Sequence, residues 1–351
     1  MNAMPTAPQY LVEAGLPARD RDTVLGLWRG NLGQDARMTA KYEWFYLRCP
    51  HGEPLMQLLL DVAGQAHVGT ASAGRRRLEW RGRELRAGVL VDLAVLPQHR
   101  SLGPALMLQQ GLIAAAGEAL DVLYGFPNPK AAPVFKRLGY AQPAQLVRYA
   151  RVLRHAGYLR ERVPRWLAPA AGWLADRVVA CRDAWTRLRS PHLRSAWADQ
   201  ADARIDAVWS GSPKGDDVIA IRDVGHLRWR FDESPLATTR YLLVKRAHDR
   251  ALQAWFAVQR IDGTLHVRDF WSVDGADGMA AMHVGELLHA ARKAGCSAVS
   301  VEMCASDAQR HGWHALHFVE RSRRPVFLRW SSPQDAAASA PLFLTSADED
   351  E

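Results

Sequence analysis

The sequence predicts an α/β fold made of two similar mixed-sheet domains in tandem, with a helical arm between them. The chain has 351 residues, more than the roughly 100–200 of a usual domain, so two domains are expected. Hydrophobic residues make up 48% and charged residues 23%, which excludes a mainly disordered or collagen-like chain. Short apolar strands alternate with helical patterns, and parts of the first half recur in the second.

The internal repeat indicates two copies of one fold. An aromatic segment that ends in proline, Trp44 to Pro50, recurs as Trp229 to Pro235. Two more matches follow in the same order, an aspartate in an apolar strand and an aromatic segment near the end of each half. These are Asp92 with Asp269, and Phe135–Tyr140 with Trp313–Phe318. Matches that keep their order predict a duplicated fold.

The first domain, residues 1–150, has a mixed order of strands and helices. Leu25, Trp28 and Leu32 form one apolar stripe, which predicts a helix. The Val/Leu-rich run Gly88–Leu96 predicts a buried strand, and Pro104 suits the first turn of the next helix. In chain order we expect strands at 9–13, 55–62, 66–71, 78–86 (turning back at 81–82), 88–96 and 122–126, and helices at 20–32, 103–120 and 130–138.

The arm, residues 151–204, is basic and amphipathic. Residues 151–200 contain 10 Arg and no Lys, and apolar residues recur at helical spacing between 171 and 188. One interpretation is a helix that packs on the two domains. The other is that the 166–188 helix lies on anionic lipid at the inner membrane surface, because tryptophans stand beside the arginines.

The second domain, residues 205–332, repeats the alternation of strands and helices. We expect strands at 240–245, 252–259, 265–271 and 298–302, a helix at 279–294, and a late helix and turn at 313–318. Residues 333–351 are rich in Ser, Ala and Pro and end in four acidic residues, so a disordered tail is expected.

Cysteine content, hydropathy and charge narrow the class of protein. The four cysteines have no metal-ligand spacing and are too few for a disulfide scaffold, so we expect no metal and a reducing compartment. No apolar run reaches the roughly 18 residues of a membrane span, and no secretory signal begins the chain, so a cytoplasmic protein is expected. The net charge of +8 suits an anionic ligand, but no basic–aromatic motif predicts a nucleic-acid partner.

The loop after strand 88–96 has the chemistry of a pyrophosphate site. Pro97 ends the strand, and a helix begins near Gly103. Amides at a helix start have no intrahelical partner, and the helix dipole favours anions there. Gly103 would let a phosphate approach the backbone, and Arg100 adds a positive charge. The loop lacks the Lys-Ser/Thr ending of a nucleoside-triphosphate loop and the three glycines of a dinucleotide site.

This loop resembles that of the GCN5-related N-acetyltransferase (GNAT) superfamily, Arg/Gln-x-x-Gly-x-Gly/Ala. A second segment resembles the family's Asn-x-x-Ala-x-x-x-Tyr/Phe-x-x-x-Gly-Phe/Tyr mark. The tandem form is similar to FemAB-like and mycothiol-synthase-like acyltransferases and, at Trp229 to Pro235, to tandem acetyltransferases of bacterial polysaccharide synthesis. The residues in the fixed places of the two motifs are Arg100, Gly103 and Ala105, and Asn128, Ala131, Phe135, Gly139 and Tyr140.

The resemblance implies that acetyl-CoA, or another acyl-CoA, binds in a cleft between two splayed central strands. Main-chain groups near Leu93 and Val95 would hold the pantetheine arm, and Asn128 and Phe135 would flank it. The residues that would surround the pyrophosphate are His99, Arg100, Ser101, Leu102, Gly103, Pro104, Ala105 and Leu106. Pro104 has no N–H, so one phosphate donor is missing.

Direct transfer to an amine needs a base. Asp92 on the central strand is the first candidate, with a purely structural role as its alternative. His67 and His99 are the other candidate bases. No cysteine has an evident base partner, so a covalent enzyme intermediate is not expected.

The sequence offers two candidates for the acid that protonates the leaving thiolate. Many family members have a tyrosine at the place of Phe135, and phenylalanine cannot donate a proton. Tyr124 or Tyr140 would replace it, or the thiolate would leave unaided.

The second domain lacks the pyrophosphate loop. Asp274 and Asp277 stand in the corresponding stretch, where negative charge would repel a phosphate. We expect this domain to buttress the first or to bind the acceptor. The candidate substrate-binding residues are Trp229, Arg230 and Trp271, because aromatic faces stack on sugar rings, although tryptophan is also ordinary core material.

These features predict an acyl-CoA-dependent N-acetyltransferase. Its acceptor would be a small-molecule or lipid-linked amine, such as an amino sugar of polysaccharide synthesis. The first alternative is a non-catalytic GNAT-fold binding or assembly protein, which Phe135 and Pro104 favour. The second alternative is FemAB-like aminoacyl transfer from charged tRNA.

Overall fold

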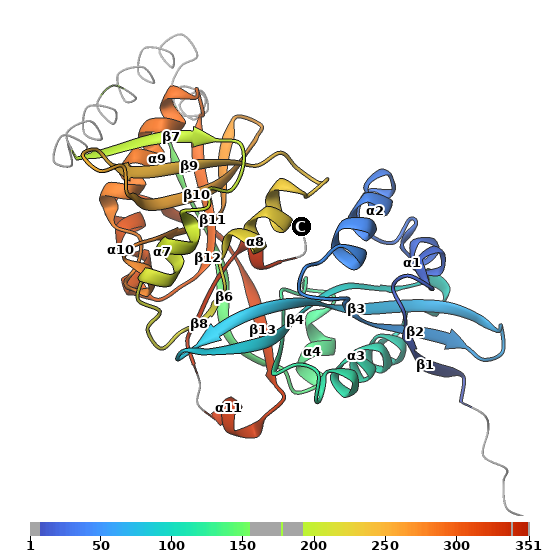
Figure 1. The fold of residues 1–351 in the computed structure, drawn as a ribbon. Helices are drawn as coiled ribbons and strands as arrows, with labels where there is room; N and C mark the ends of the chain where they lie inside the picture. The colour runs from blue at the N-terminus through green and yellow to red at the C-terminus, as the bar shows by residue number, and fades with distance from the viewer. Residues whose placement is uncertain (1–7, 155–176, 178–191, 338–339, 350–351) are drawn as a thin grey trace, which may run out of the picture.

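The computed structural model describes residues 8–154, 177, 192–337 and 340–349. The strands join into one 14-stranded sheet that runs through both halves of the chain (Figure 1). The main path has the order β1-β2-β3-β4-β5-β13-β6-β12-β11-β10-β9-β7, with β8 and β14 attached beside it. The predicted mixed α/β class is confirmed.

The first half follows the expected order up to α4, except that the strands expected at 66–71, 78–86 and 88–96 form two long strands, and β6 was not expected. It also contains a helix that we did not expect, α2, and a short π-helical turn after it, η1. The strands are β1 (Tyr10–Gly15), β2 (Leu55–Asp61), β3 (Ala66–Trp80), β4 (Arg83–Val95), β5 (Val122–Gly125) and β6 (Ala141–Val152), and the helices are α1 (Arg21–Trp28), α2 (Asp35–Tyr42), η1 (Glu43–Leu47), η2 (Pro97–His99), α3 (Leu102–Ala116) and α4 (Ala132–Arg137).

The second half repeats this plan, including a π-helical turn, η3. Its strands are β7 (Leu193–Ala198), β8 (Val218–Ala220), β9 (Arg240–Arg246), β10 (Leu252–Ile261), β11 (Thr264–Ser272), β12 (Ala298–Cys304), β13 (Val319–Trp330) and β14 (Leu342–Thr345). Its helices are α7 (Ile205–Gly211), α8 (Val224–Leu227), η3 (Arg228–Asp232), η4 (Gly275–Asp277), α9 (Ala281–Lys293), α10 (Asp307–Ala315), α11 (Pro333–Ala337) and η5 (Ser346–Asp348).

Equivalent hairpins lead into the central strand of each half. Arg81 and Gly82 turn β3 into β4, with φ of 52° and 75°. Asp262 and Gly263 turn β10 into β11, with φ of 48° and 76°. Two successive residues with positive φ are typical of a type I′ turn, whose twist matches that of paired strands. In each half the central strand is then followed by a helix and a parallel strand.

Helices cover both faces of the first half of the sheet (Figure 1). Leu108, Leu112 and Ala116 recur on one side of α3 and are buried against the sheet with α4. Helices α1 and α2 and the turn η1 pack on the opposite face. The residue spacing of α3 therefore fixes which side of the helix is buried.

The two halves exchange strands at the centre of the sheet. Strand β13, from the second half, lies between β5 and β6 and pairs antiparallel with both. Strand β6, from the first half, pairs with β12 of the second. The expected boundaries at 150 and 332 therefore do not separate two independent sheets. The boundary at 204 is also too late, because β7 pairs with β9 and belongs to the second half.

The expectation of a disordered acidic tail is wrong for residues 340–349. Strand β14 pairs with the end of β12 and with β8. Phe343 and Leu344 are buried, and Asp348 is 1% exposed. The apolar side chains at 342–344 explain why this segment is ordered, because burying them stabilises it against the core. The Ser/Ala/Pro-rich composition around them had suggested disorder.

The interpretations of the 166–188 helix lie outside the described residues, apart from Arg177. Within the described part of the chain, no helix is long and apolar enough to cross a membrane.

Candidate active site

A cleft opens in the first half where two neighbouring parallel strands separate. Residues Ala87–Val89 of β4 pair with Val122–Tyr124 of β5, and the pairing ends there. Beyond this point β4 pairs only with β3 and contains a bulge at Asp92, whose φ is 52°. The bulge turns the strand and leaves backbone groups of β4 without a strand partner on the β5 side. The cavity here has a volume of about 690 Å³.

Both halves of the chain line this cleft. The first half supplies α1, α2, the end of β4 and the segment after β5, while the second supplies η3, the loop after it and the β10–β11 hairpin. The polar and charged side chains among the lining residues are Gln34, Arg37, Lys41, Asp92, Gln109, Asn128, Arg230, Ser234, Gln259 and Arg268.

Asp92 lies in the cleft within a network of polar contacts. Lys41 donates to one carboxylate oxygen at 2.8 Å, and Tyr46 donates its hydroxyl to the other at 2.9 Å. The side chain of Asp92 is 6% exposed and that of Lys41 is 10% exposed. Burial and the neighbouring Asp92 charge raise the pKa of Tyr46, so its phenol stays protonated as a donor. These contacts fix the orientation of the Asp92 carboxylate in the cleft.

The start of α3 has the features of an anion site. Ser101 is the N-cap residue and makes no side-chain cap bond. The amides of Leu102 and Gly103 lie in the first turn, where no intrahelical acceptor exists, and Pro104 has no N–H. A Cβ built on Gly103 would meet nothing closer than the Ser101 hydroxyl, at 3.9 Å. The first turn therefore offers backbone donors next to open space.

Arg100 and His99 do not point freely into this space. The Arg100 guanidinium donates to the Val95 carbonyl at 3.0 Å and to the side chain of Asn31. The Nδ1 of His99 is 3.0 Å from the Tyr10 hydroxyl. The side chain of Arg100 thus holds the loop against the end of β4, and Val95 uses its carbonyl for this contact.

The other predicted cofactor residues lie as follows. Leu93, Asn128 and Phe135 line the cleft. The side-chain oxygen of Asn128 accepts from the amides of Lys130 and Ala131, both at 3.0 Å, and so shapes the entry to α4. Leu106 follows the first turn of α3 and packs on the sheet face that α3 covers.

The two candidate acids are buried away from the cleft. Neither Tyr124 nor Tyr140 is a lining residue. The Tyr124 hydroxyl donates to the backbone carbonyl of Asp348 at 3.0 Å. Tyr140 packs behind Phe135, with ring centroids 5.2 Å apart. Burial raises the pKa of both phenols, which makes them weaker acids, so their predicted catalytic role is wrong.

The alternative bases also lie outside the cleft. His67 is 3.1 Å from the carboxylate of Glu13, and neither it nor His99 lines the cavity. Asp92 is the only carboxylate among the described residues that line the cleft.

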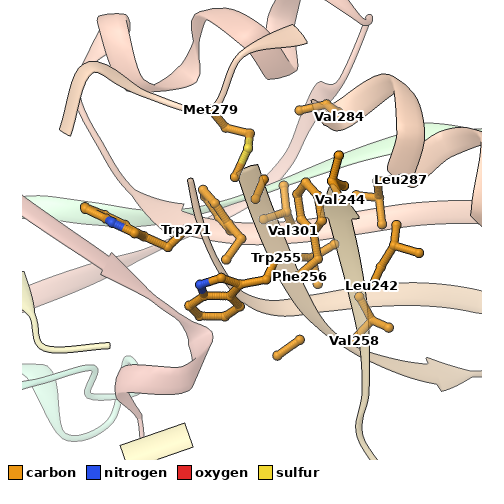
Figure 2. Close-up of a cluster of buried hydrophobic side chains, with 14 of the residues drawn as sticks. Leu242, Val244, Trp255, Phe256, Val258, Trp271, Met279, Val284, Leu287 and Val301 are labelled. Carbon is orange, nitrogen blue, oxygen red and sulfur yellow. The ribbon is translucent and has the colours of Figure 1, made fainter. Parts of the chain in front are cut away.

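Of the predicted acceptor residues, only Arg230 lines the cleft. Trp229 is 2% exposed and stacks on Trp44 at the junction of the two halves. Trp271 is 2% exposed and donates to the Ser212 hydroxyl at 2.8 Å. Figure 2 shows Trp271 among the buried side chains of the second half. Neither tryptophan can stack on a ligand, so the sequence prediction for both is wrong.

Many lining residues were not predicted from the sequence, among them Trp28, Arg37, Lys41 and Gln109. Trp28 was assigned only to an apolar stripe, and α2, which carries Arg37 and Lys41, was not expected at all. Helix α2 is eight residues long and has only one strongly apolar residue, Met38. A short, basic, amphipathic segment before the repeated tryptophan segment was the available signal.

The equivalent cleft of the second half is filled by the protein itself. Strands β11 and β12 pair over Thr264–Val267 and Ala298–Val301 and then separate. Strand β14 pairs with the end of β12, and the Ser346 hydroxyl in η5 donates to the Arg268 carbonyl at 3.2 Å. Residues 342–348 therefore occupy the gap that stays open in the first half.

No group of three or more potential metal ligands occurs in the described part of the chain. No protein-family model matches this sequence, and no curated protein matches it either.

Solved structures do share the fold. A probable N-acyltransferase from Enterococcus faecalis superposes with a TM-score of 0.64 at 11% identity, over 92% of this chain and 73% of the other. A GCN5-related N-acetyltransferase from Kribbella flavida gives 0.60 at 14% identity, over 94% and 74%. Saccharomyces cerevisiae N-myristoyltransferase, solved with myristoyl-CoA, gives 0.53 at 12% identity, over 93% and 84%. The chain therefore has the GNAT fold that its two motifs predicted.

Proposed function

We propose that the protein is an N-acyltransferase that transfers an acyl group from acyl-CoA, such as acetyl-CoA, to an amine acceptor in the first cleft. The observation that carries the proposal is the open separation of β4 and β5, which ends beside the uncapped first turn of α3. An acyl-CoA needs both a slot for its arm and donors for its pyrophosphate. The similar folds of a probable N-acyltransferase, a GCN5-related N-acetyltransferase and an N-myristoyltransferase support the same assignment.

The residues fit such a ligand. The first-turn amides of α3 would bind the pyrophosphate, and the open space at Gly103 leaves room for it. Backbone groups of β4 near Leu93, together with Asn128 and Phe135, would hold the pantetheine arm. Gln109 lines the cleft, is 1% exposed and has a side-chain oxygen with no hydrogen-bond partner in the described structure. A buried unpaired acceptor favours a ligand N–H at this place.

Acyl-CoA supplies a thioester, whose carbonyl carbon forms a C–N bond with the acceptor nitrogen while its C–S bond breaks to release the CoA thiolate. Asp92 would take the proton that the nitrogen loses, because it is the only lining carboxylate among the described residues. Lys41 and Tyr46 hold its two oxygens and so orient it. Since Tyr124 and Tyr140 do not face the cleft, the thiolate would take its proton from solvent.

Calorimetric titration with acetyl-CoA and with CoA tests the site directly. The matched variants are Gly103→Glu, in the first turn of α3, and Gly285→Glu, in the equivalent helix α9. A Cβ at either position would meet no protein atom closer than 3.9 Å. Because the carboxylate at 103 would repel a pyrophosphate, we expect Gly103→Glu to weaken binding by about tenfold or more and Gly285→Glu to leave it unchanged. No binding to the unmodified protein at millimolar ligand would overturn the proposal.

Transfer itself is measured by release of the free CoA thiol with a panel of amines, amino sugars included. A non-catalytic CoA-binding protein is the second candidate, and the absence of a phenol among the described lining residues favours it. Binding of CoA without thiol release for any amine would identify that second function.

A further inference from the structure

The charged groups at the mouth of the first cleft point to the chemistry of the acceptor. We propose that the acceptor amine also carries an anionic group, a carboxylate or a phosphate, and that Arg37 and the indole N–H of Trp28 bind it. This inference rests on the proposed function, because it names the substrate class of the same cleft.

Arg37 is the exposed cation at the mouth of the cleft. It lies on α2, one turn before Lys41, and lines the cavity. Its side chain is exposed, and no ion pair joins it to another residue in the part of the chain that the structure describes. The guanidinium can therefore form the paired hydrogen bonds that carboxylates and phosphates accept.

Trp28 supplies an independent sign of a ligand. It is 1% exposed and lines the cleft, and its Nε1 has no acceptor in the described structure. Buried donors are mostly satisfied, so an unpaired one in a residue that lines the cavity favours an acceptor that comes from a ligand. Lys41 Nζ, which donates to Asp92, lies over the Trp28 ring at 5.8 Å from the ring centroid.

The remaining charges of the cleft agree with an anionic acceptor. Lys41, Arg230 and Arg268 also line it, against the single carboxylate of Asp92. Lys41 is engaged by Asp92, and Arg230 donates to the Ala347 carbonyl at 2.8 Å. These side chains thus make the electrostatic potential in the cleft more positive, while Arg37 would contact the anionic group of the acceptor directly. A second cavity, of about 680 Å³, has the opposite character, with Glu79, Glu84, Asp206 and Asp223 around Arg77.

The test compares acceptors that differ only in the anionic group. Thiol release from acetyl-CoA is measured with serine against serinamide, and with glucosamine 6-phosphate against glucosamine. We expect the anionic member of at least one pair to have a KM lower by about 10–100-fold, the value of a hydrogen-bonded charge. The pair that responds distinguishes a carboxylate from a phosphate.

Variants then assign the effect to Arg37. Arg37→Gln is expected to abolish the preference by raising the KM of the anionic acceptor, while the KM of acetyl-CoA is unchanged. Arg37→Lys should restore part of the preference, and Trp28→Phe should reduce it. Arg29→Gln is the matched control, because Arg29 is exposed and does not line the cleft.

The outcomes separate the two proposals. Transfer that is equal for the charged and neutral amines overturns this inference and leaves the acyltransferase assignment intact. A rise in the KM of acetyl-CoA in Arg37→Gln also overturns it, because Arg37 would then bind the cofactor. Failure of the protein to bind CoA removes the proposed function, and this inference with it.

Discussion

The two clefts of this molecule form in the same way, but one is open and the other is filled by protein. In each half two parallel strands pair for three or four residues and then separate. The first gap stays open and holds Asp92 with Lys41 and Tyr46. The second is filled by residues 342–348, and its aspartate, Asp269, is bound by Arg222 and Thr345 instead.

This difference shows that the same arrangement of strands can form an open ligand site in one half and a packed protein core in the other. Separated strands leave polar backbone and buried side chains that need partners. In the second half the chain supplies these partners from its own C-terminal segment. In the first half no segment of the described chain fills the gap between the strands. A bound ligand would supply the missing partners there.

The largest effect is expected from removing the segment that fills the second cleft. Deletion of residues 342–351 would expose the core around Phe343 and leave Asp269 and Arg222 without two of their partners. We expect the protein to lose its cooperative unfolding transition by thermal and urea denaturation.

A milder variant tests the same segment if the deleted protein does not fold. Phe343→Ala should lower the free energy of unfolding by about 3–5 kcal/mol, because Phe343 is 3% exposed and packs on Phe270 and Trp271. Leu11→Ala, at a residue that is 44% exposed, is the control. Equal stability of the two variants would show that the segment is not part of the core.

The two aspartates should divide stability from catalysis. Asp269→Asn breaks an ion pair whose side chains are 1% and 2% exposed, and we expect it to cost about 3 kcal/mol of stability without changing the Kd of acetyl-CoA. Asp92→Asn should lower kcat/KM for transfer by a factor of about 10²–10⁴ and leave acetyl-CoA binding intact. Full activity in Asp92→Asn would assign Asp92 a structural role.

A smaller effect is expected at the junction of the halves, where the repeated tryptophans meet. The Trp44 indole donates to the Trp229 carbonyl at 2.7 Å, and the Trp229 indole donates to the Trp44 carbonyl at 3.3 Å. Either Trp→Phe change should cost about 1–2 kcal/mol in urea denaturation, more for Trp44 because its bond is shorter. Strictly additive losses in the double variant would show that the two bonds do not depend on each other.

The smallest effect concerns pH. The Nε2 atom of His51 lies 3.1 Å from the Nδ1 atom of His226. Burial lowers the pKa of His51 to about 4 and lowers the pKa of His226 well below its usual value. The folded state therefore resists protons that the unfolded state binds below about pH 6.5, so stability falls as pH drops through that range. His51→Gln should flatten this dependence in thermal melts.

The pH dependence of stability in His51→Gln must be compared with that of the unmodified protein, because other groups also titrate in this range. Burial raises the pKa of Asp348, and that group acts in the opposite direction, losing stability as pH rises above the usual aspartate value. An unchanged slope in His51→Gln would mean that other groups determine the acid dependence.

The sequence predicted correctly those elements whose structure depends on residues close together in the chain. The hairpin at Arg81 and Gly82, the buried strand before Pro97 and the helix after Gly103 are all confirmed. Each depends on residues close together in the chain, as turn chemistry and apolar spacing do.

The rest depended on partners distant in the chain. Nothing local places β13 beside β5, and nothing local distinguishes a tryptophan that faces a ligand from one, like Trp271, that faces the core. The acidic tail composition indicated disorder, although a short apolar run at 342–344 was the signal for β14. The cleft-lining residues of α2 were missed because that helix is short and mostly polar.

The strand exchange also sets the order in which this protein can complete its folding. The proposed site belongs mainly to the first half, yet β5 gains its second neighbour only when residues 319–330 arrive. Arg230, in the same cleft, is held by a carbonyl at residue 347. During synthesis the early half would therefore keep an exposed strand edge until residues 319–330 have left the ribosome. Contacts of such long sequence separation fold slowly, so a nascent chain stalled before residue 319 should be a target for chaperones.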